Sequence, residues 1–477
     1  MKNLVLSIAL FLAALLYSRA EIVLPSLFGD NMVLQQNARV KVWGEANAYT
    51  RISATCSWDH RTYSAKADAA GRWSMYIETP EAGGPYEISF SNMVGGDKLT
   101  LQQVYIGEVW ICSGQSNMVH PVRGYLPKQP IDGSAEALAE ADKYKLIHSF
   151  IVPRDTAGVP QPMCGGEWKD GSSENIAGVS ALAYFYAKEL YKALNVPVGI
   201  IVSSWGSSRI EAWMSEAAIK DAGGVDVERL SKESKIQKRP SLAYNAMIAP
   251  IEGYAARGFL WCQLGANRKD YANYTSVLAT MVDSWRTAWG APDMPFINVQ
   301  AAMFPWDGSA DKITLPLIVE KQFEARKLID NYYIATATDL GSPKEPHYPQ
   351  KNVNAARLAG MALKYVYGKD GYHPDAPDFA SVDFKGEKVV VTFTNAGEGL
   401  VCKGDKVLAF ELAGKDRKFY PAEARITAPD KVTVECAEVL EPVAMRYAFR
   451  NYREVSLYNS YGQTPRVYRT DDWDDVF

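Results

Sequence analysis

Apolar and polar residues alternate in short runs over the first part of the chain, residues 21–103. Strand-like runs cover 39–43, 51–56, 73–77 and 86–90, and Gly, Pro and Asn-Ala turns separate them. Alternation with a period of two places apolar side chains on one face of a β-strand. The pattern therefore predicts an N-terminal module that resembles a β-sandwich.

Nearly continuous apolar runs alternate with helical periodicity between residues 104 and 368. The predicted strands cover 104–112, 198–205, 258–264, 295–302 and 332–338, and the predicted helices cover 179–194, 271–289 and 315–329. Strands without polar alternation are typical of a parallel sheet that helices cover on both faces. This part is predicted to be an α/β domain that binds its ligand outside the carboxyl ends of the strands.

The β pattern returns in the last part of the chain, residues 369–477. The predicted strands cover 388–394, 407–412, 431–436 and 444–449. They are short and bounded by turn residues, as in the first module. A second β module is therefore predicted to close the chain.

Residues 1–20 have the pattern of a secretory signal peptide. Lys2 precedes an apolar run over 4–17, and Ser18 and Ala20 place small residues at the two positions that a signal peptidase reads. The run is shorter than the roughly 20 residues of a membrane-spanning helix. We expect cleavage after residue 20, a secreted or periplasmic protein, and no membrane span in the mature chain.

The charge balance argues against a nucleic-acid partner. Lys plus Arg number 51 and Asp plus Glu number 55, so no basic excess is available to neutralise a phosphate backbone. The six cysteines are widely spaced and fit no zinc-binding pattern. Cys112 and Cys262 lie in apolar predicted strands, where we expect buried thiols.

A glycine-containing turn follows the first strand of the predicted α/β sheet. It reads SGQSNM over residues 113–118 and would project Ser116 at the carboxyl edge of the sheet. A serine hydroxyl acts as a nucleophile only when a base removes its proton and donors stabilise the oxyanion. Ser116 is therefore a candidate nucleophile. The alternative is that Ser116 and Asn117 only cap the following helix.

Five histidines could supply the base. His347 lies in the polar loop after the last predicted strand of the sheet, where Glu345 and Asp339 could orient its imidazole. His120, four residues after Ser116, is the rival base or a pocket-lining group. The alternative for a histidine in such a loop is simple exposure to solvent.

Two more loops follow strands of the same predicted sheet. The loop at 203–209 offers the backbone N–H of Gly206, and the loop at 263–267 offers the amide of Asn267. A backbone N–H and an amide aimed at one point are what an oxyanion hole requires. Each loop taken alone is also typical of an ordinary turn. Together, Ser, Gly, Asn and His follow successive strands in order.

This order of residue types resembles the SGNH hydrolases, which are named after Ser, Gly, Asn and His, and in particular their sialate O-acetylesterase family. The similarity covers most of the chain after residue 20. The stretches that carry it are GEVWICSGQSNM at 107–118, LFGDNMVLQ at 27–35, IEAW at 210–213, YNAMIAP at 244–250 and YRTDDW at 468–473. The resemblance implies a flavodoxin-like SGNH hydrolase domain with a parallel sheet, flanked by the two β modules.

The resemblance also implies the chemistry. Ser116 is the implied nucleophile and His347 the implied general base, while the N–H groups of Ser116 and Gly206 and the amide of Asn267 hold the oxyanion. The implied reaction is hydrolysis of O-acetyl esters of a carbohydrate through a serine acyl-enzyme. Neither a metal nor a cofactor is implied.

The chain departs from the family pattern in two of these loops. Residues 264–266 read LGA where relatives carry GES, although Asn267 is retained, and Ser207 stands where a second glycine usually follows Gly206. The first change bears on the role of Asn267, and the second bears on the fit of the substrate.

The orienting acid is a third departure. Many SGNH enzymes carry an Asp three residues before the histidine, but Lys344 occupies that position. Glu345 is the favoured acid because it lies two residues before His347, and Asp339 is the alternative. A Ser–His dyad without an acid is the third option.

Three side chains beside these loops, Gln115, Arg209 and Gln263, are expected to contact the substrate. The guanidinium of Arg209 could pair with the carboxylate of sialic acid, or it could form a surface or interdomain salt bridge. The leading hypothesis is a sialate O-acetylesterase that removes groups such as the 9-O-acetyl. The alternatives are an acetylesterase on plant glycans (xylan, xyloglucan or pectin) and an inactive carbohydrate-binding protein on an esterase scaffold.

Overall fold

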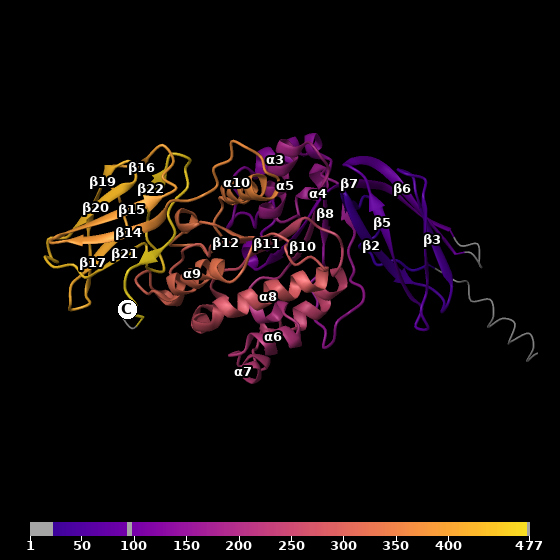
Figure 1. Ribbon diagram of the computed structural model, residues 1–477, viewed down its shortest axis with the longest axis horizontal. Coiled ribbons are helices and arrows are strands. Elements are labelled where there is room, and N and C mark those ends of the chain that lie inside the picture. The colour runs from indigo at the N-terminus through magenta and orange to yellow at the C-terminus, as the bar shows by residue number, and fades with distance from the viewer. Residues whose placement is uncertain (1–21, 93–97, 475–477) are drawn as a thin grey trace, which may run out of the picture.

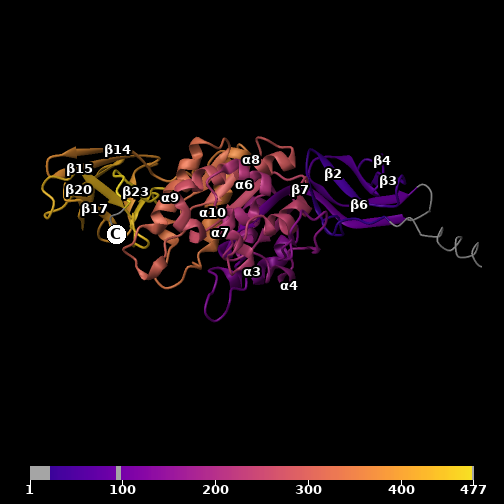
Figure 2. The same ribbon diagram turned by 90° about the horizontal axis from the view of Figure 1, so that it is seen from below.

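Three parts follow one another along the computed structural model, which describes residues 22–92 and 98–474 (Figure 1). A β module drawn in indigo lies at one end, an α/β part lies in the middle, and a second β module drawn in yellow lies at the other end. Figure 2 shows the same row from below. The predicted signal peptide, residues 1–20, lies outside the described residues.

The N-terminal module contains all four strands that its alternating pattern predicts. Every second residue of β5 is buried, which is the alternation that predicted it. β2 pairs with β5, and β3 pairs with β4 and β6. The strands are β1 (Val33–Gln35), β2 (Ala38–Glu45), β3 (Arg51–Cys56), β4 (Thr62–Lys66), β5 (Arg72–Thr79) and β6 (Gly83–Asn92).

Strand β7 (Lys98–Gly114) runs from this module into the central sheet. Its first half pairs antiparallel with β6, and its second half pairs in parallel with β10 and β11. The domain boundary predicted between residues 103 and 104 therefore falls inside one continuous strand and not in a linker.

The five strands predicted for the α/β part are present and mutually parallel. They lie in the order β10-β7-β11-β12-β13, which is the 2-1-3-4-5 order of one type of doubly wound sheet. Two strands that were not predicted, β8 and β9, extend the sheet beyond β10. The bounds are β8 (Ile147–Ile151), β9 (Trp168–Lys169), β10 (Val198–Ser204), β11 (Gly258–Cys262), β12 (Phe296–Val299) and β13 (Tyr332–Ala335).

Helices lie on both sides of this sheet (Figure 1): α5 and α10 above it in the view, and α6 and α8 below it. The three predicted helices correspond to α5, α8 and α9, whereas α10 was not predicted. The bounds are α2 (Ser116–Val119), α3 (Ser134–Glu140), α4 (Ser173–Ile176), α5 (Ala181–Leu194), α6 (Glu216–Ala222), α7 (Val227–Ser231), α8 (Tyr274–Trp289), α9 (Thr314–Glu324) and α10 (Lys351–Met361).

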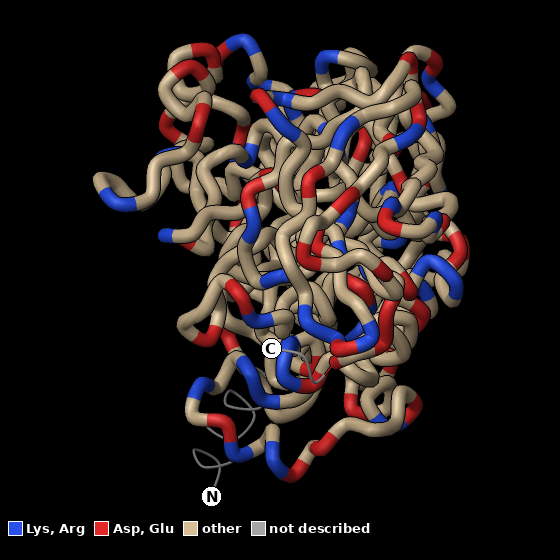
Figure 3. Tube along the Cα trace, turned by 90° about the vertical axis from the view of Figure 1, so that its left-hand side faces the viewer, with Lys and Arg blue, Asp and Glu red and all other residues tan. Residues whose placement is uncertain are grey.

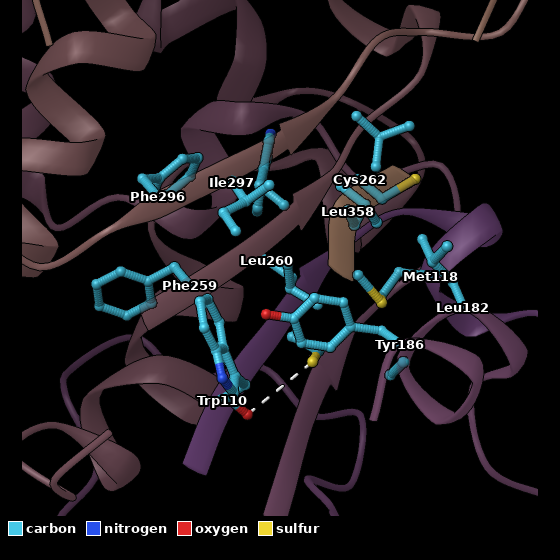
Figure 4. Packing of buried hydrophobic residues seen from close by; sticks show 14 of the residues in the cluster. Trp110, Met118, Leu182, Tyr186, Phe259, Leu260, Cys262, Phe296, Ile297 and Leu358 are labelled. Carbon is cyan, nitrogen blue, oxygen red and sulfur yellow. Dashed lines mark hydrogen bonds between the residues drawn. The ribbon is translucent and has the colours of Figure 1, made fainter. Parts of the chain in front are cut away.

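Large apolar side chains fill the space between the sheet and its helices (Figure 4). Trp110, Phe259, Leu260 and Phe296 come from three adjacent strands, and each exposes 1% of its surface or less. Burying a side chain of this size stabilises a fold by about 1.5–3 kcal/mol. This core packs β7, β11 and β12 together.

All six cysteines are free thiols. Cys112 and Cys262 are buried in β7 and β11, as their apolar surroundings predict. Burial raises the pKa of the Cys262 thiol to about 12, so that it is protonated near neutral pH.

Glu108, within the stretch 107–118, joins the N-terminal module to the α/β part. Its buried carboxylate accepts hydrogen bonds from the side-chain amides of Gln35 and Gln36. It also pairs with Nε and Nη2 of Arg257 at 2.8 and 3.0 Å and accepts from the hydroxyl of Tyr367. This glutamate therefore has a structural role between the two parts.

The C-terminal module contains two four-stranded sheets, β14-β15-β20-β19 and β18-β17-β21-β23. The predicted strand at 407–412 is shorter than expected, because Val407 makes only an isolated bridge and β17 begins at Phe410. The bounds are β14 (Asp378–Lys385), β15 (Lys388–Thr394), β16 (Leu400–Cys402), β17 (Phe410–Ala413), β18 (Phe419–Pro421), β19 (Glu423–Ala428), β20 (Lys431–Glu435), β21 (Ala444–Tyr447), β22 (Leu457–Asn459) and β23 (Tyr468–Arg469).

Ion pairs attach this module to the α/β part beside α9. Arg326 lies 2.9 Å from Asp378, and Arg469 lies 2.7 Å from Glu320. Over the whole trace, Lys and Arg are interspersed with Asp and Glu (Figure 3). Within residues 22–92 and 98–474, no helix is long and apolar enough to cross a membrane.

Candidate active site

Ser116 lies at the carboxyl end of β7, in the middle of the central sheet. The strand ends at Gly114, whose φ of +130° is strained for any other residue and whose added Cβ would meet the carbonyl oxygen of Cys262 at 2.2 Å. Ser116 is the first residue of α2 and is partly exposed, whereas its neighbours Gln115 and Asn117 are buried. The turn therefore presents Ser116 at the sheet edge, as predicted.

Gln115 connects three loops. Its side-chain oxygen accepts a hydrogen bond from the N–H of Leu264 at 2.6 Å, and its amide nitrogen donates to the carbonyl of Ser208 at 2.5 Å. Both ends of this buried side chain are thus engaged. Its contacts hold the Ser116 turn against the loops after β10 and β11. A contact of Gln115 with the substrate stays a prediction.

Gly206 lies directly beside Ser116. A Cβ added to Gly206 would lie 3.4 Å from the Cβ of Ser116, so the backbone of the loop lies close to the serine. The N–H of Trp205 donates to the carbonyl of Gly114 at 3.0 Å, which fixes the loop on the end of β7. The structure thus brings together two residues that are 90 positions apart in the sequence.

Asn267 lies in the 3₁₀ helix after β11 and is buried against Glu211. Its amide nitrogen lies 2.9 and 3.0 Å from the two carboxylate oxygens of Glu211. Its amide oxygen accepts from the N–H of Ile210 at 3.1 Å. These contacts fix the orientation of the amide. Glu211 belongs to the family-like stretch 210–213, but the sequence reasoning assigned it no role.

Arg209 is 4% exposed, and carboxylates surround its guanidinium. Nη2 lies 2.8 Å from Glu211 and 2.8 Å from Asp270, and Nε lies 3.1 Å from the second oxygen of Glu211. Arg209 thus forms a salt bridge, which the alternative expected at the surface or between domains, but this bridge is buried within the α/β part. A contact with a substrate carboxylate stays a prediction. Arg209 balances the buried charge of Glu211.

Gln263 also supports Asn267. Its amide nitrogen donates to Oδ1 of Asn267 at 2.9 Å, and its oxygen accepts from the hydroxyl of Tyr274 at 2.6 Å. The side chain is buried. Like Gln115 and Arg209, it is engaged with other groups of the protein. A contact of Gln263 with the substrate stays a prediction.

His347 and Glu345 form a hydrogen-bonded pair in the loop before α10. Nδ1 of His347 lies 3.0 Å from Oε1 of Glu345, and the same oxygen accepts from the backbone N–H of His347 at 3.3 Å. Burial lowers the pKa of His347, and nearby Lys351 acts in the same direction while Glu345 opposes it. The imidazole is therefore neutral near neutral pH, the state that a general base requires.

Asp339, the alternative acid, is engaged elsewhere. Its two carboxylate oxygens each lie 2.8 Å from the guanidinium nitrogens of Arg357 on α10. Arg357 also donates to the backbone carbonyls of Thr336 and of Gly462 in the C-terminal module. Asp339 therefore belongs to a structural ion pair between loop, helix and module.

His120, the rival base, lies beside His347 but is held differently. Its ring is stacked on Tyr125 and meets the ring of His347 edge to face, with centroids 4.9 and 5.8 Å away. Its Nε2 lies 3.2 Å from the carbonyl of Gln129, and its Nδ1 is buried without a hydrogen-bond partner. Burial lowers the pKa of His120 to about 4, so its imidazole is uncharged near neutral pH and lines the site.

The Ser116 turn and the His347 loop are connected directly. The amide nitrogen of Asn117 donates to the carbonyl of Pro346 at 3.2 Å. Lys351, which the sequence reasoning did not single out, donates to the amide oxygen of Asn117. A lysine among the buried positions of α10 is a signal that would have pointed to it. In the described ranges, no group of three or more His, Cys, Asp and Glu residues is arranged to hold a metal ion.

A family model described as "Carbohydrate esterase, sialic acid-specific acetylesterase" matches residues 106–364 of this chain. The range begins in β7, includes the other four predicted parallel strands and ends in the helical segment after α10. It therefore contains Ser116, Gly206, Asn267 and His347.

Individual relatives agree with this match. The sialate O-acetylesterases of Pongo abelii and Homo sapiens are 25% and 24% identical to this chain, and each alignment covers 92% of this chain and 90% of the relative. The structure of a carbohydrate acetylesterase from Xanthomonas citri is 32% identical, with a TM-score of 0.85, over 95% of this chain and all of that one. The chain therefore belongs to the carbohydrate esterase family of sialic acid-specific acetylesterases, and it is an ester hydrolase.

Proposed function

We propose that the chain is an SGNH-type serine esterase in which Ser116 is the nucleophile and His347 the general base. The observation that carries this proposal is the 3.0 Å contact between Glu345 and Nδ1 of His347, in a loop hydrogen-bonded to the residue after Ser116. The Nδ1–H donates to Glu345, so Nε2 keeps the lone pair that can accept the serine proton. The 2-1-3-4-5 strand order supports the assignment, because ligands in such flavodoxin-like sheets bind where the order reverses, beside the first strand.

The proposed reaction is acyl transfer in two steps. The hydroxyl oxygen of Ser116 attacks the acetyl carbonyl carbon while His347 takes the serine proton. The sugar oxygen leaves with that proton, and the acetyl group stays on Ser116. A water molecule then gives a proton to His347 and attacks the acyl-enzyme, which releases acetate and returns the proton to Ser116.

The oxyanion is proposed to bind between three donors. The N–H of Ser116, at the first position of α2, has no partner within its own helix, and the backbone of Gly206 lies against Ser116. Asn267 supplies the third donor. One hydrogen of the Asn267 amide is donated to both carboxylate oxygens of Glu211. The second hydrogen of the amide is then available to the oxyanion.

The proposed substrate is an O-acetylated sugar, with O-acetyl sialic acid as the first candidate. The family description and the names of the relatives from Pongo abelii and Homo sapiens support this choice. Gln115, Arg209 and Gln263 each have hydrogen-bond or ion-pair partners within the protein, which limits what they can offer the sugar.

A neutral acetylated glycan is the second candidate, and Arg209 favours it. The carboxylate of sialic acid needs a cation, but the guanidinium of Arg209 is already neutralised by Glu211 and Asp270. The uncharged backbones of acetylated xylan and xyloglucan place no such demand on the site, whereas pectin carries carboxylates of its own. The similarity to a carbohydrate acetylesterase is compatible with either class of substrate.

Acetate release tests these proposals. Purified protein is incubated with 9-O-acetyl sialic acid, acetylated xylan and acetylated xyloglucan, beside Ser116→Ala as the matched control. We expect the control to lose on the order of 10³-fold or more of kcat. Turnover at an equal rate in the control would remove Ser116 as the nucleophile. Preference for the plant glycans would overturn the sialic-acid assignment, and a folded wild type without turnover would favour the carbohydrate-binding alternative.

We also propose that the protein is exported after cleavage at residue 20. The support is the apolar run at residues 4–17 and the small residues Ser18 and Ala20. Amino-terminal sequencing of the protein recovered from its native host tests this. A chain that still begins at Met1 would contradict it.

A further inference from the structure

Lys351 is a buried cation next to the proposed active site. It is the first residue of α10, and it is 0% exposed. Its Nζ donates to Oδ1 of Asn117 at 2.5 Å and to the backbone carbonyl of Tyr348 at 2.8 Å, and it lies 3.4 Å from the centroid of the Tyr348 ring. A lysine is rarely buried completely, because removing an ammonium group from water is costly unless its donors are satisfied.

The groups around Lys351 carry no formal negative charge. They are an amide oxygen, a backbone carbonyl and an aromatic ring, and the thiol of Cys262 is protonated near neutral pH. Burial consequently lowers the pKa of Lys351 to about 7. A methionine or leucine would fill this volume at less cost, so packing alone does not explain a lysine here.

The two hydrogen bonds of Lys351 reach both halves of the proposed catalytic pair. Asn117 follows Ser116 directly, and Tyr348 follows His347 directly. Asn117 in turn donates to the carbonyl of Pro346, on the other side of His347. Lys351 and Asn117 thus form hydrogen bonds with the backbone on both sides of His347. These bonds connect that backbone to α2, which begins with Ser116.

We propose that Lys351 is a positioning residue that, through Asn117 and the carbonyl of Tyr348, sets the distance between Ser116 and His347. The inference rests on the proposed serine mechanism and adds a residue to it. Lys351 does not touch the reacting atoms. It acts by fixing the position of the two loops relative to each other. This position matters because a misplacement of about 1 Å between nucleophile and base can cost on the order of 10²-fold in rate.

The charge of Lys351 should also affect the pKa of His347, which can be measured independently of the rate. Three groups face His347: Glu345 on its own loop, His120 at the end of α2, and Lys351 on α10. Lys351 lowers the pKa of both histidines, whereas Glu345 raises it. Removing the cation should therefore raise the pKa of His347, so that the acid limb of the kcat/KM profile moves to higher pH.

The test compares Lys351→Met with Lys351→Gln. Methionine keeps the volume but loses both the donors and the charge, whereas glutamine keeps a donor without the charge. Lys188→Met is the matched control, because Lys188 is also largely buried but pairs with Glu140, away from the site. Wild-type turnover of p-nitrophenyl acetate that depends on Ser116 is established first, so that failure of the proposed function is recognised separately.

We expect Lys351→Met to lose on the order of 10²-fold of kcat/KM, Lys351→Gln to lose less, and both to move the acid limb to higher pH. Lys188→Met should change neither quantity. The double variant Lys351→Met with Asn117→Ala should lose little more kcat/KM than the more impaired of the two single variants, because the two residues act through one contact. ¹³C-labelled histidine NMR gives the pKa of His347 even in a variant with low activity.

Two outcomes overturn the inference. One is a folded Lys351→Met with activity within about twofold of wild type. The other is an unchanged His347 titration and acid limb in both Lys351 variants, which would reduce Lys351 to a packing role. If Lys351→Met does not fold, Lys351→Gln and Asn117→Ala decide the question by the same two measurements.

Discussion

The amide nitrogen of Asn267 lies within 3.0 Å of both carboxylate oxygens of Glu211, and both side chains are buried. A carboxylate beside an oxyanion site would by itself oppose the negative charge that develops there. Arg209 offsets that charge at 2.8 Å. Glu211, in the family-like stretch at 210–213, thus orients the amide of Asn267. Arg209, just before this stretch, supplies the positive charge that offsets the charge of Glu211.

Glu211→Gln should weaken both activity and stability. We expect kcat to fall by about 10²-fold, the typical effect of losing one oxyanion donor, and the free energy of unfolding to fall by about 3 kcal/mol, because Arg209 loses a buried partner. Urea titration and p-nitrophenyl acetate turnover measure the two effects. Glu228→Gln removes an exposed ion pair with Lys232 and should cost under about 1 kcal/mol. Equal effects of the two variants would contradict the network.

Glu345→Gln and Asp339→Asn should separate catalysis from stability. Glu345 contacts the imidazole of His347, so its loss should lower kcat by about 10²-fold or more with little change in unfolding. Asp339 pairs with Arg357, so its loss should mainly destabilise the fold. Kinetics and thermal unfolding of both variants provide the measurement. A larger fall in kcat for Asp339→Asn would reassign the orienting acid.

The acid limb of the pH profile should report His347 and not His120. Burial lowers the pKa of His347 from its ordinary value, and a general base must be unprotonated. The acid limb of kcat/KM should therefore have its midpoint below about pH 6.5, and activity should fall as the pH drops through it. His120, with a pKa of about 4, is neutral across this range. His120→Gln should leave the midpoint in place, and a shifted midpoint would make His120 part of the ionisation.

Gly114→Ala should be far more damaging than an alanine at another left-handed glycine. An added Cβ at Gly114 would lie 2.2 Å from the carbonyl oxygen of Cys262, so β7 and β11 would have to separate. At Gly290, the C-cap of α8, φ is also positive but the space is open. Gly290→Ala should cost about 1 kcal/mol, and Gly114→Ala clearly more, with loss of turnover. Similar unfolding midpoints would show that the close approach is not needed.

Much of the fold could be predicted from periodicity. The strands β3 and β15 have the predicted bounds, and the five parallel strands lie where continuous apolar runs placed them. Helix α10 was missed because lysine, asparagine and arginine interrupt its apolar pattern, and those residues are buried here through tertiary hydrogen bonds. Strand β8 was missed because a histidine and a serine in it gave no clear period.

The candidate site was predicted as a set of residue types but not as a set of contacts. Ser116, Gly206, Asn267, Glu345 and His347 follow strand ends, and a parallel sheet must bring strand ends of one polarity to one edge. Substrate contacts were assigned to Gln115, Arg209 and Gln263 because polar groups near a reactive turn suggest binding. Their partners lie far along the chain or depend on local turns, so only the folded structure decides whether such a group faces inward.

The sequence by itself determined the order of the three parts, the parallel strands and the loops that carry Ser, Gly, Asn and His, because periodicity and turn residues are local properties. The tertiary structure alone decided how those loops are held: Gln115 across three loops, Glu211 between Arg209 and Asn267, and Lys351 beneath Asn117. These are contacts between residues up to 234 positions apart. Their geometry depends on how the sheet and helices pack, which no local pattern encodes.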